Sequence, residues 1–127
     1  MSHKTGMLPM NLAELKHAIF GGESDTVEFK ESLQEESLHT VGAFANTRGG
    51  VLLIGVGNSG VVVGTTVGKS TVREVVDRIA SCTDPRVVPD VSVVTLQRRA
   101  VIAIQVPEYP IKPVAVRGRC YSRVNAS

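Results

Sequence analysis

The chain has 127 residues with a formal net charge of +2, 43% hydrophobic and 20% charged residues, and two cysteines. This composition predicts one folded domain and excludes a wholly disordered chain, because the apolar share can build a core and the charges are mixed. The apolar runs are too short for a membrane span and the cysteines stand outside any zinc-binding spacing, so we expect a protein of the reducing cytoplasm with no membrane partner.

The first predicted elements are a helix and a strand. Met10–Phe20 carries apolar residues at helical spacing, with Asn11 as a plausible cap and two glycines directly after it. Thr26–Lys30 alternates apolar and charged residues, which is typical of a half-buried strand. Glu28 and Lys30 are then expected to share a solvent-facing side.

The middle of the chain predicts a second helix and a buried strand. Residues 34–47 repeat apolar side chains every three to four positions. Val51–Val56 is a continuous apolar run bounded by glycines, which predicts a strand covered on both faces. Val61–Val63 is expected to be its hairpin partner. The GxGxxG match at Gly55–Gly60 leads into these valines rather than into a helix, which favours a turn over a dinucleotide site.

The last elements complete an α+β fold. Thr71–Cys82 predicts a third helix. Val91–Leu96 and Ala100–Val106 predict two strands joined at Gln97-Arg98-Arg99, and Arg119–Val124 a final strand. Because helices and hairpins are interspersed, we expect a mixed sheet packed against about three helices.

Charge is distributed unevenly along the chain. Residues 1–45 carry three Lys and Arg against seven Asp and Glu, whereas residues 85–127 carry seven against two. Clustered cations attract phosphates even on a nearly neutral protein, so the last third is the predicted anion-facing region. Alternation along the final strand would place Arg119, Tyr121 and Arg123 in one row.

Two weaker motifs touch on catalysis. Gly64–Ser70 imitates a Walker A loop but has three residues between its glycines where the motif has four, which argues against nucleotide hydrolysis. Glu23 and Glu28 could pair around a divalent cation, although a solvated acidic edge is the simpler interpretation.

Five segments, in this order along the chain, form a specific combination: Glu23–Lys30, Ala43–Val56, Val106–Glu108, Lys112–Val114 and Tyr121–Val124. Together they closely resemble the AlbA-type DNA-binding domain of Schlafen proteins and of bacterial and archaeal transcriptional regulators, a family once described as a divergent ATPase. The resemblance extends from about Gly21 to Val124 and implies an N-terminal helical extension, 1–20, and a nucleic-acid-binding α+β domain, 21–127.

The resemblance also implies an alternative. Some Schlafen relatives are metal-dependent endoribonucleases with three carboxylates, and Glu23 and Glu28 match the first two. The third falls at Gly57, Asn58 or Ser59, where this chain has no carboxylate.

The leading hypothesis is a non-catalytic, regulatory nucleic-acid-binding module that needs no cofactor or metal and contacts the phosphate backbone with little sequence specificity. DNA is favoured over RNA, and homo-oligomer formation is left open. The alternatives are an endoribonuclease with Mg²⁺ or Mn²⁺ at Glu23 and Glu28, with Lys30 stabilising developing charge, and a nucleotide-binding or oligomerisation module. The predicted nucleic-acid contacts are Lys30, Arg48, Arg98, Arg99, Lys112, Arg117, Arg119 and Arg123.

Overall fold

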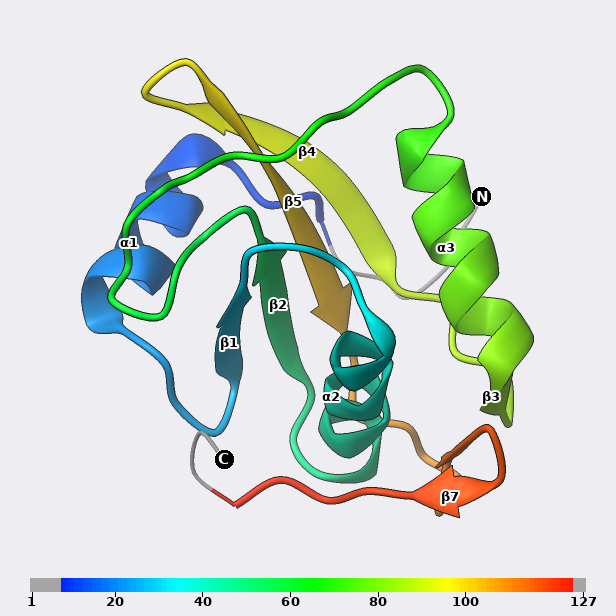
Figure 1. Cartoon of the computed structure of the whole chain (residues 1–127). Coiled ribbons are helices and arrows are strands. Elements are labelled where there is room, and N and C mark those ends of the chain that lie inside the picture. The colour runs from blue at the N-terminus through cyan, green and yellow to red at the C-terminus, as the bar shows by residue number, and fades with distance from the viewer. Residues whose placement is uncertain (1–7, 125–127) are drawn as a thin grey trace.

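A mixed sheet of four strands, in the order β1-β2-β5-β4, organises the computed structural model, which describes residues 8–124 (Figure 1). The first seven residues of the predicted N-terminal extension, and residues 125–127, lie outside the described part. β1 and β2 are parallel, while β2 and β5, and β5 and β4, are antiparallel. The strands are β1 (Val27–Lys30), β2 (Gly50–Ile54), β4 (Asp90–Leu96) and β5 (Arg99–Val106).

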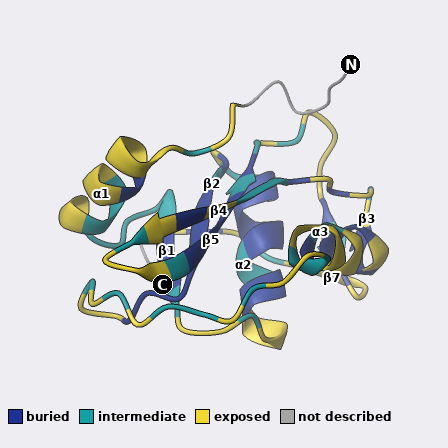
Figure 2. Cartoon of the chain, turned by 90° about the horizontal axis from the view of Figure 1, so that it is seen from above, coloured by how far each residue is buried: buried dark blue, intermediate teal, exposed yellow. Residues whose placement is uncertain are grey.

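Helices cover both faces of this sheet, as Figures 1 and 2 show. α1 (Leu12–Gly21) lies on one face, and α2 (Glu35–Asn46) and α3 (Thr71–Cys82) lie on the other. α1 begins with a capping box between Asn11 and Glu14, as its predicted cap requires. The mixed sheet and its three helices confirm the predicted α+β fold. None of the described helices is long and apolar enough to cross a membrane.

The central strand β2 is buried on both faces, as its apolar run predicts. Leu52 and Ile54 pack in the cluster that includes α2 and α3, whereas Val51 and Leu53 pack in the cluster beneath α1. Burial of each such side chain contributes about 1.5–3 kcal/mol to folding. β2 therefore holds the two clusters together and fixes where the flanking strands lie.

Two glycines join α2 to β2 at close quarters. A Cβ on Gly50 would lie 2.6 Å from the Phe44 ring and 2.7 Å from the Thr26 carbonyl oxygen. Gly49 has a φ of +75°, and a Cβ there would lie 2.7 Å from the Val106 carbonyl oxygen. The chain needs glycine at both positions because backbone and an aromatic ring occupy the space a side chain would take.

Two strand predictions are wrong in detail. Val61–Val63 forms no strand, and only an isolated bridge links Val62 to Val56. β1 and β5 occupy both edges of β2, so no edge is left for Val61–Val63, and the chain leaves the strand at Gly55, which has a φ of +106°. The predicted strand Arg119–Val124 is limited to β7 (Arg119–Cys120), which belongs to a small second sheet with β3 (Thr83–Asp84) and β6 (Ala115–Val116).

Candidate nucleic-acid interface

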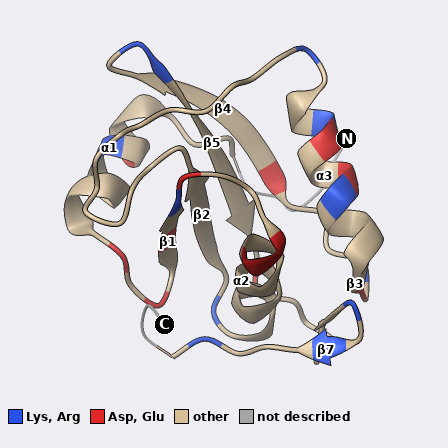
Figure 3. Ribbon diagram, viewed as in Figure 1, with Lys and Arg blue, Asp and Glu red and all other residues tan. Residues whose placement is uncertain are grey.

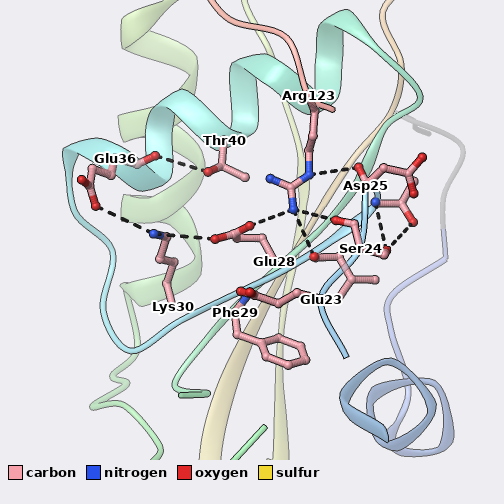
Figure 4. A network of polar contacts seen from close by, with 11 residues as sticks. Glu23, Ser24, Asp25, Glu28, Phe29, Lys30, Glu36, Thr40 and Arg123 are labelled. Carbon is pink, nitrogen blue, oxygen red and sulfur yellow. Dashed lines mark hydrogen bonds and ion pairs between the residues drawn. The ribbon is translucent and has the colours of Figure 1, made fainter. Parts of the chain in front are cut away.

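Arg123 is buried at the start of β1 and is not on the surface. Its side chain is 2% exposed, and its guanidinium lies 4.8 Å from the centre of the Phe44 ring. Figure 4 shows its polar partners around β1. Nη2 donates to Glu28 Oε1 at 2.7 Å. The guanidinium also donates to three backbone oxygens, those of Ser24, Asp25 and Val27. The predicted row of Arg119, Tyr121 and Arg123 is therefore wrong, because the chain turns inward after β7, and Arg123 cannot contact a phosphate in this structure.

Glu28 and Lys30 share one side of β1, as predicted, but that side is not open to solvent. Glu28 is only 9% exposed, because Arg123 lies over it. Lys30 Nζ is 3.6 Å from Glu28 Oε2 and 3.8 Å from Glu36 Oε1, so it links β1 to α2 (Figure 4). The period-two pattern correctly predicts that the two side chains share a side of the strand. It cannot show that α2 and the C-terminal segment cover that side.

The two carboxylates that matched the nuclease pattern are held by other groups. Glu23 Oε2 accepts a hydrogen bond from the Phe29 amide at 2.9 Å, and Glu28 is paired with Arg123. Among residues 8–124, no three His, Cys, Asp or Glu side chains form a group that could hold a metal ion. The third position, Gly57–Ser59, lies in the turn after β2, where Gly57 donates its amide hydrogen to the Val61 oxygen.

Three more of the predicted contacts have carboxylate partners at the surface. Arg48 pairs with Asp25 and Lys112 with Glu108. Arg117 Nε lies 2.8 Å from Glu35 Oε2. Exposed pairs of this kind contribute about 0–1 kcal/mol each, so they add little stability. They do reduce the positive potential that these cations present to a polyanion.

The end of the molecule near β7 carries a thiol and two arginines. Arg117 and Arg119 flank Gly118 in the β6–β7 turn, and Arg119 has no carboxylate partner in the described part of the chain. Burial raises the pKa of the Cys82 thiol, and the nearby Arg117 charge opposes this increase. Cys82 is therefore a protonated, packed side chain beside this turn.

The turn between β4 and β5 presents arginines in a different setting. Gln97 and Arg98 have φ angles of 55° and 65°, which is the conformation of a tight two-residue hairpin turn. Arg98 and Arg99 are both exposed, and neither has a carboxylate partner within residues 8–124. Arg99 Nη1 donates to the Val63 carbonyl oxygen at 3.2 Å. A hollow of about 320 Å³ lies between this turn and the loop at Val63–Thr66.

The predicted basic set does not gather on one face. Figure 3 shows the β4–β5 turn and β7 at opposite ends of the molecule. Ion pairs within the chain neutralise part of the uneven charge. Arg117 pairs with Glu35 and Arg123 with Glu28, which links the basic last third to the acidic first third. The sequence did not predict that the loop at Val63–Thr66 lies beside the β4–β5 turn, because no spacing in the sequence relates the two segments.

Comparisons with known proteins place this geometry among known folds. The family model for Schlafen, AlbA_2 matches residues 23–127. A domain with the same fold is the N-terminal domain of a protein related to the DNA helicase RecG, from Nitrosomonas europaea, with 22% identity and a TM-score of 0.66 over 93% of this chain and 91% of that one.

The DIP2311 protein of Corynebacterium diphtheriae also has this fold, with 24% identity and a TM-score of 0.66 over 81% of this chain. The matched part spans only 21% of that longer protein. No curated protein matches the chain. At these identities the two solved structures show a shared fold and nothing further.

Proposed function

The chain belongs to the Schlafen AlbA_2 family, and from this premise we propose that it binds the phosphate backbone of nucleic acid, with the β4–β5 turn as its main contact. The observation that carries the proposal is the exposure of Arg98 and Arg99 without a carboxylate partner in the described part of the chain. A guanidinium without a carboxylate partner keeps its full charge, and the donors other than Arg99 Nη1, which donates to the Val63 oxygen, are available for phosphate oxygens.

The remaining predicted contacts that reach the surface have a secondary place in this proposal. Lys30, Arg48, Lys112 and Arg117 each have a carboxylate partner that a phosphate would have to displace. Arg119 has no such partner in residues 8–124, but it lies at the opposite end of the molecule (Figure 3). The main contact is therefore the hairpin turn.

Low sequence specificity follows from the side chains available. The chain has three Phe, two Tyr and no Trp. Phe29 and Phe44 are buried, both tyrosines are half-buried, and Phe20 on α1 is the one phenylalanine of residues 8–124 that is exposed. A base-stacking platform of the kind used by single-strand binding proteins needs several exposed aromatic rings for successive bases, which a single exposed phenylalanine does not supply. Backbone contacts that release counterions would then supply most of the affinity, as expected of a module that holds nucleic acid for regulation.

The proposed activity includes no catalytic step. The Glu23 carboxylate is engaged by a backbone amide and the Glu28 carboxylate by a buried guanidinium. A metal ion would have to compete with both, and a third ligand is lacking at the matched position. We expect labelled RNA to stay intact with the protein and Mn²⁺ or Mg²⁺. Cleavage that Glu28→Gln abolishes would replace this proposal with the endoribonuclease.

The test is a salt titration of duplex DNA and of RNA with the Arg98→Ala/Arg99→Ala double variant. Each lost phosphate contact lowers the slope of log K against log salt by about 0.9 for a DNA duplex, which is about tenfold in affinity at 0.1 M salt. The matched control is Arg117→Ala/Arg119→Ala, which removes the same charge from the opposite end. Equal losses in both variants, or none in the hairpin variant, would contradict the proposed surface.

A further inference from the structure

We infer that the hollow beside the β4–β5 turn seats a single phosphate group, to which the hydroxyl groups of Thr65 and Thr66 donate together with Arg98 and Arg99. The inference rests on the proposed function, since the phosphate would be one of the nucleic-acid backbone. It goes beyond that function because it assigns a role to two neutral side chains and to the Val63–Thr66 loop.

The walls of the hollow are fixed by hydrogen bonds from both sides. Val63 and Gly64 each donate an amide hydrogen to the Gly55 oxygen, at 2.9 Å in both cases. The Thr65 amide donates to the Ala100 oxygen at 2.9 Å, and Arg99 Nη1 donates to the Val63 oxygen. The loop is thus attached to the end of β2 and to β5, so its backbone is held in place before a ligand arrives.

The loop approaches the hairpin unusually closely. Gly64 has a φ of +78°, and a Cβ on it would lie 3.0 Å from the Arg99 Cβ. A larger residue would separate the loop from the strand and widen the hollow. Because residue 64 is glycine, the loop can lie close enough to β5 for Thr65, Thr66 and the arginine side chains to line one hollow.

The lining offers donors and no acidic group. It consists of Val63, Gly64, Thr65, Thr66, Arg98, Arg99 and Ala100. Thr65 is half-buried and Thr66 exposed. Two guanidinium groups supply positive charge, and hydroxyl groups add short neutral donors that can reach further oxygens of the same tetrahedral anion. The absence of a carboxylate among these residues favours an anion over a metal ion or a cationic ligand.

This arrangement also explains the Walker-like segment in a new way. The segment Gly64–Ser70 does not wrap round a phosphate, because its Gly68 amide is taken by Thr71 Oγ1 at 2.7 Å. Lys69 is not among the residues that line the hollow. The first half of the segment lines the proposed seat. The positive charge comes from the hairpin arginines, whereas in a P-loop it comes from the lysine of the motif.

The deciding variant is Thr65→Val/Thr66→Val, which keeps the shape of the loop and removes the hydroxyl groups. We expect affinity for a DNA duplex to fall about tenfold, since hydrogen bonds to charged groups are among the stronger ones. The salt slope should not change, because neutral donors release no counterions. The matched control is Thr95→Val, an exposed threonine on β4 that does not line the hollow.

Two outcomes separate the seat from the proposed function. If the wild type binds DNA but the threonine double variant binds equally well, the seat is overturned and the proposed function stands. If the wild type binds no nucleic acid, the proposed function fails. The seat then depends on a titration with inorganic phosphate followed by amide NMR shifts: shifts at Thr65, Thr66 and Arg99 support it as a site for free phosphate, and their absence overturns it.

Discussion

Arg123 and the two hairpin arginines belong to the same basic third of the sequence, yet they have opposite surroundings. The Arg123 side chain is 2% exposed and has four oxygen partners. Arg98 and Arg99 are exposed and have no carboxylate partner in residues 8–124. This difference shows that cations clustered in the sequence do not by themselves form a binding surface. Whether a carboxylate elsewhere in the fold reaches each cation decides what it can bind.

The buried arginine has a structural role that depends on the acceptors around its Nε and Nη2 donors. Removing a charge from water is costly, and a single carboxylate seldom compensates for it. Here Glu28 neutralises the charge, and the backbone oxygens of Ser24, Asp25 and Val27 accept further hydrogen bonds from Nε and Nη2. The guanidinium therefore ties the C-terminal segment to β1 and to the Phe44 ring of α2.

The largest effect is expected from Arg123→Met. This change leaves the buried Glu28 with only its longer contact to Lys30, at 3.6 Å. We expect it to cost about 3–5 kcal/mol in the free energy of unfolding, whereas Arg98→Met on the surface should cost less than about 0.5 kcal/mol. Urea denaturation followed by circular dichroism measures both.

The double variant Glu28→Met/Arg123→Met checks the cause of that loss. If the unpaired charge is responsible, replacing both partners should recover much of the stability, because apolar side chains of similar size need no partner. A double variant as unstable as Arg123→Met alone, or a single variant of wild-type stability, would show that the pair is not what fixes the segment.

A smaller loss is expected from Asn46→Ala, which sharpens the comparison because Asn46 holds the segment that carries Arg123. Its Nδ2 donates to the Val114 and Tyr121 oxygens at 2.9 and 2.8 Å, and its Oδ1 accepts from the Val114 amide. Without it the buried Val114 amide lacks an acceptor, at a cost of about 1–3 kcal/mol. In urea denaturation, the loss in Asn46→Ala/Arg123→Met should be less than additive. Full additivity would mean that the two residues act independently.

Local sequence patterns predicted the elements well. The helix Thr71–Cys82 has the bounds expected from its apolar spacing, and the double-sided burial of β2 follows from its continuous apolar run. The hairpin at Gln97-Arg98-Arg99 was also correct, because two valine-rich runs flank one short polar segment. The helix and the hairpin depend on contacts between residues that are close in sequence, whereas the apolar run of β2 predicts its burial without identifying the distant residues that bury it.

The site could be predicted only in part, because its contacts link distant segments. Arg123 and Glu28 are 95 residues apart, and no periodicity relates them. Likewise, Arg99 meets Val63 across 36 residues. The sequence identified Arg98 and Arg99 as exposed cations at a turn, but the ion pairs that engage Arg48 and Arg117 depend on how α2 and the turn before β1 fold against them.

The smallest effect we predict is for Gln97→Glu, which places a carboxylate beside Arg98 and so gives the hairpin turn the partner that it lacks. The change should weaken DNA binding about two- to threefold, the effect of one charge roughly 8 Å from a phosphate in water, and leave the unfolding free energy within about 0.5 kcal/mol. Arg86→Gln is the matched control: it lowers net charge equally, on an exposed loop before the far end of β4. Fluorescence anisotropy at one fixed salt concentration compares the two. If both variants weaken binding equally, affinity depends on net charge. Whether an arginine has a carboxylate partner then has no effect on affinity.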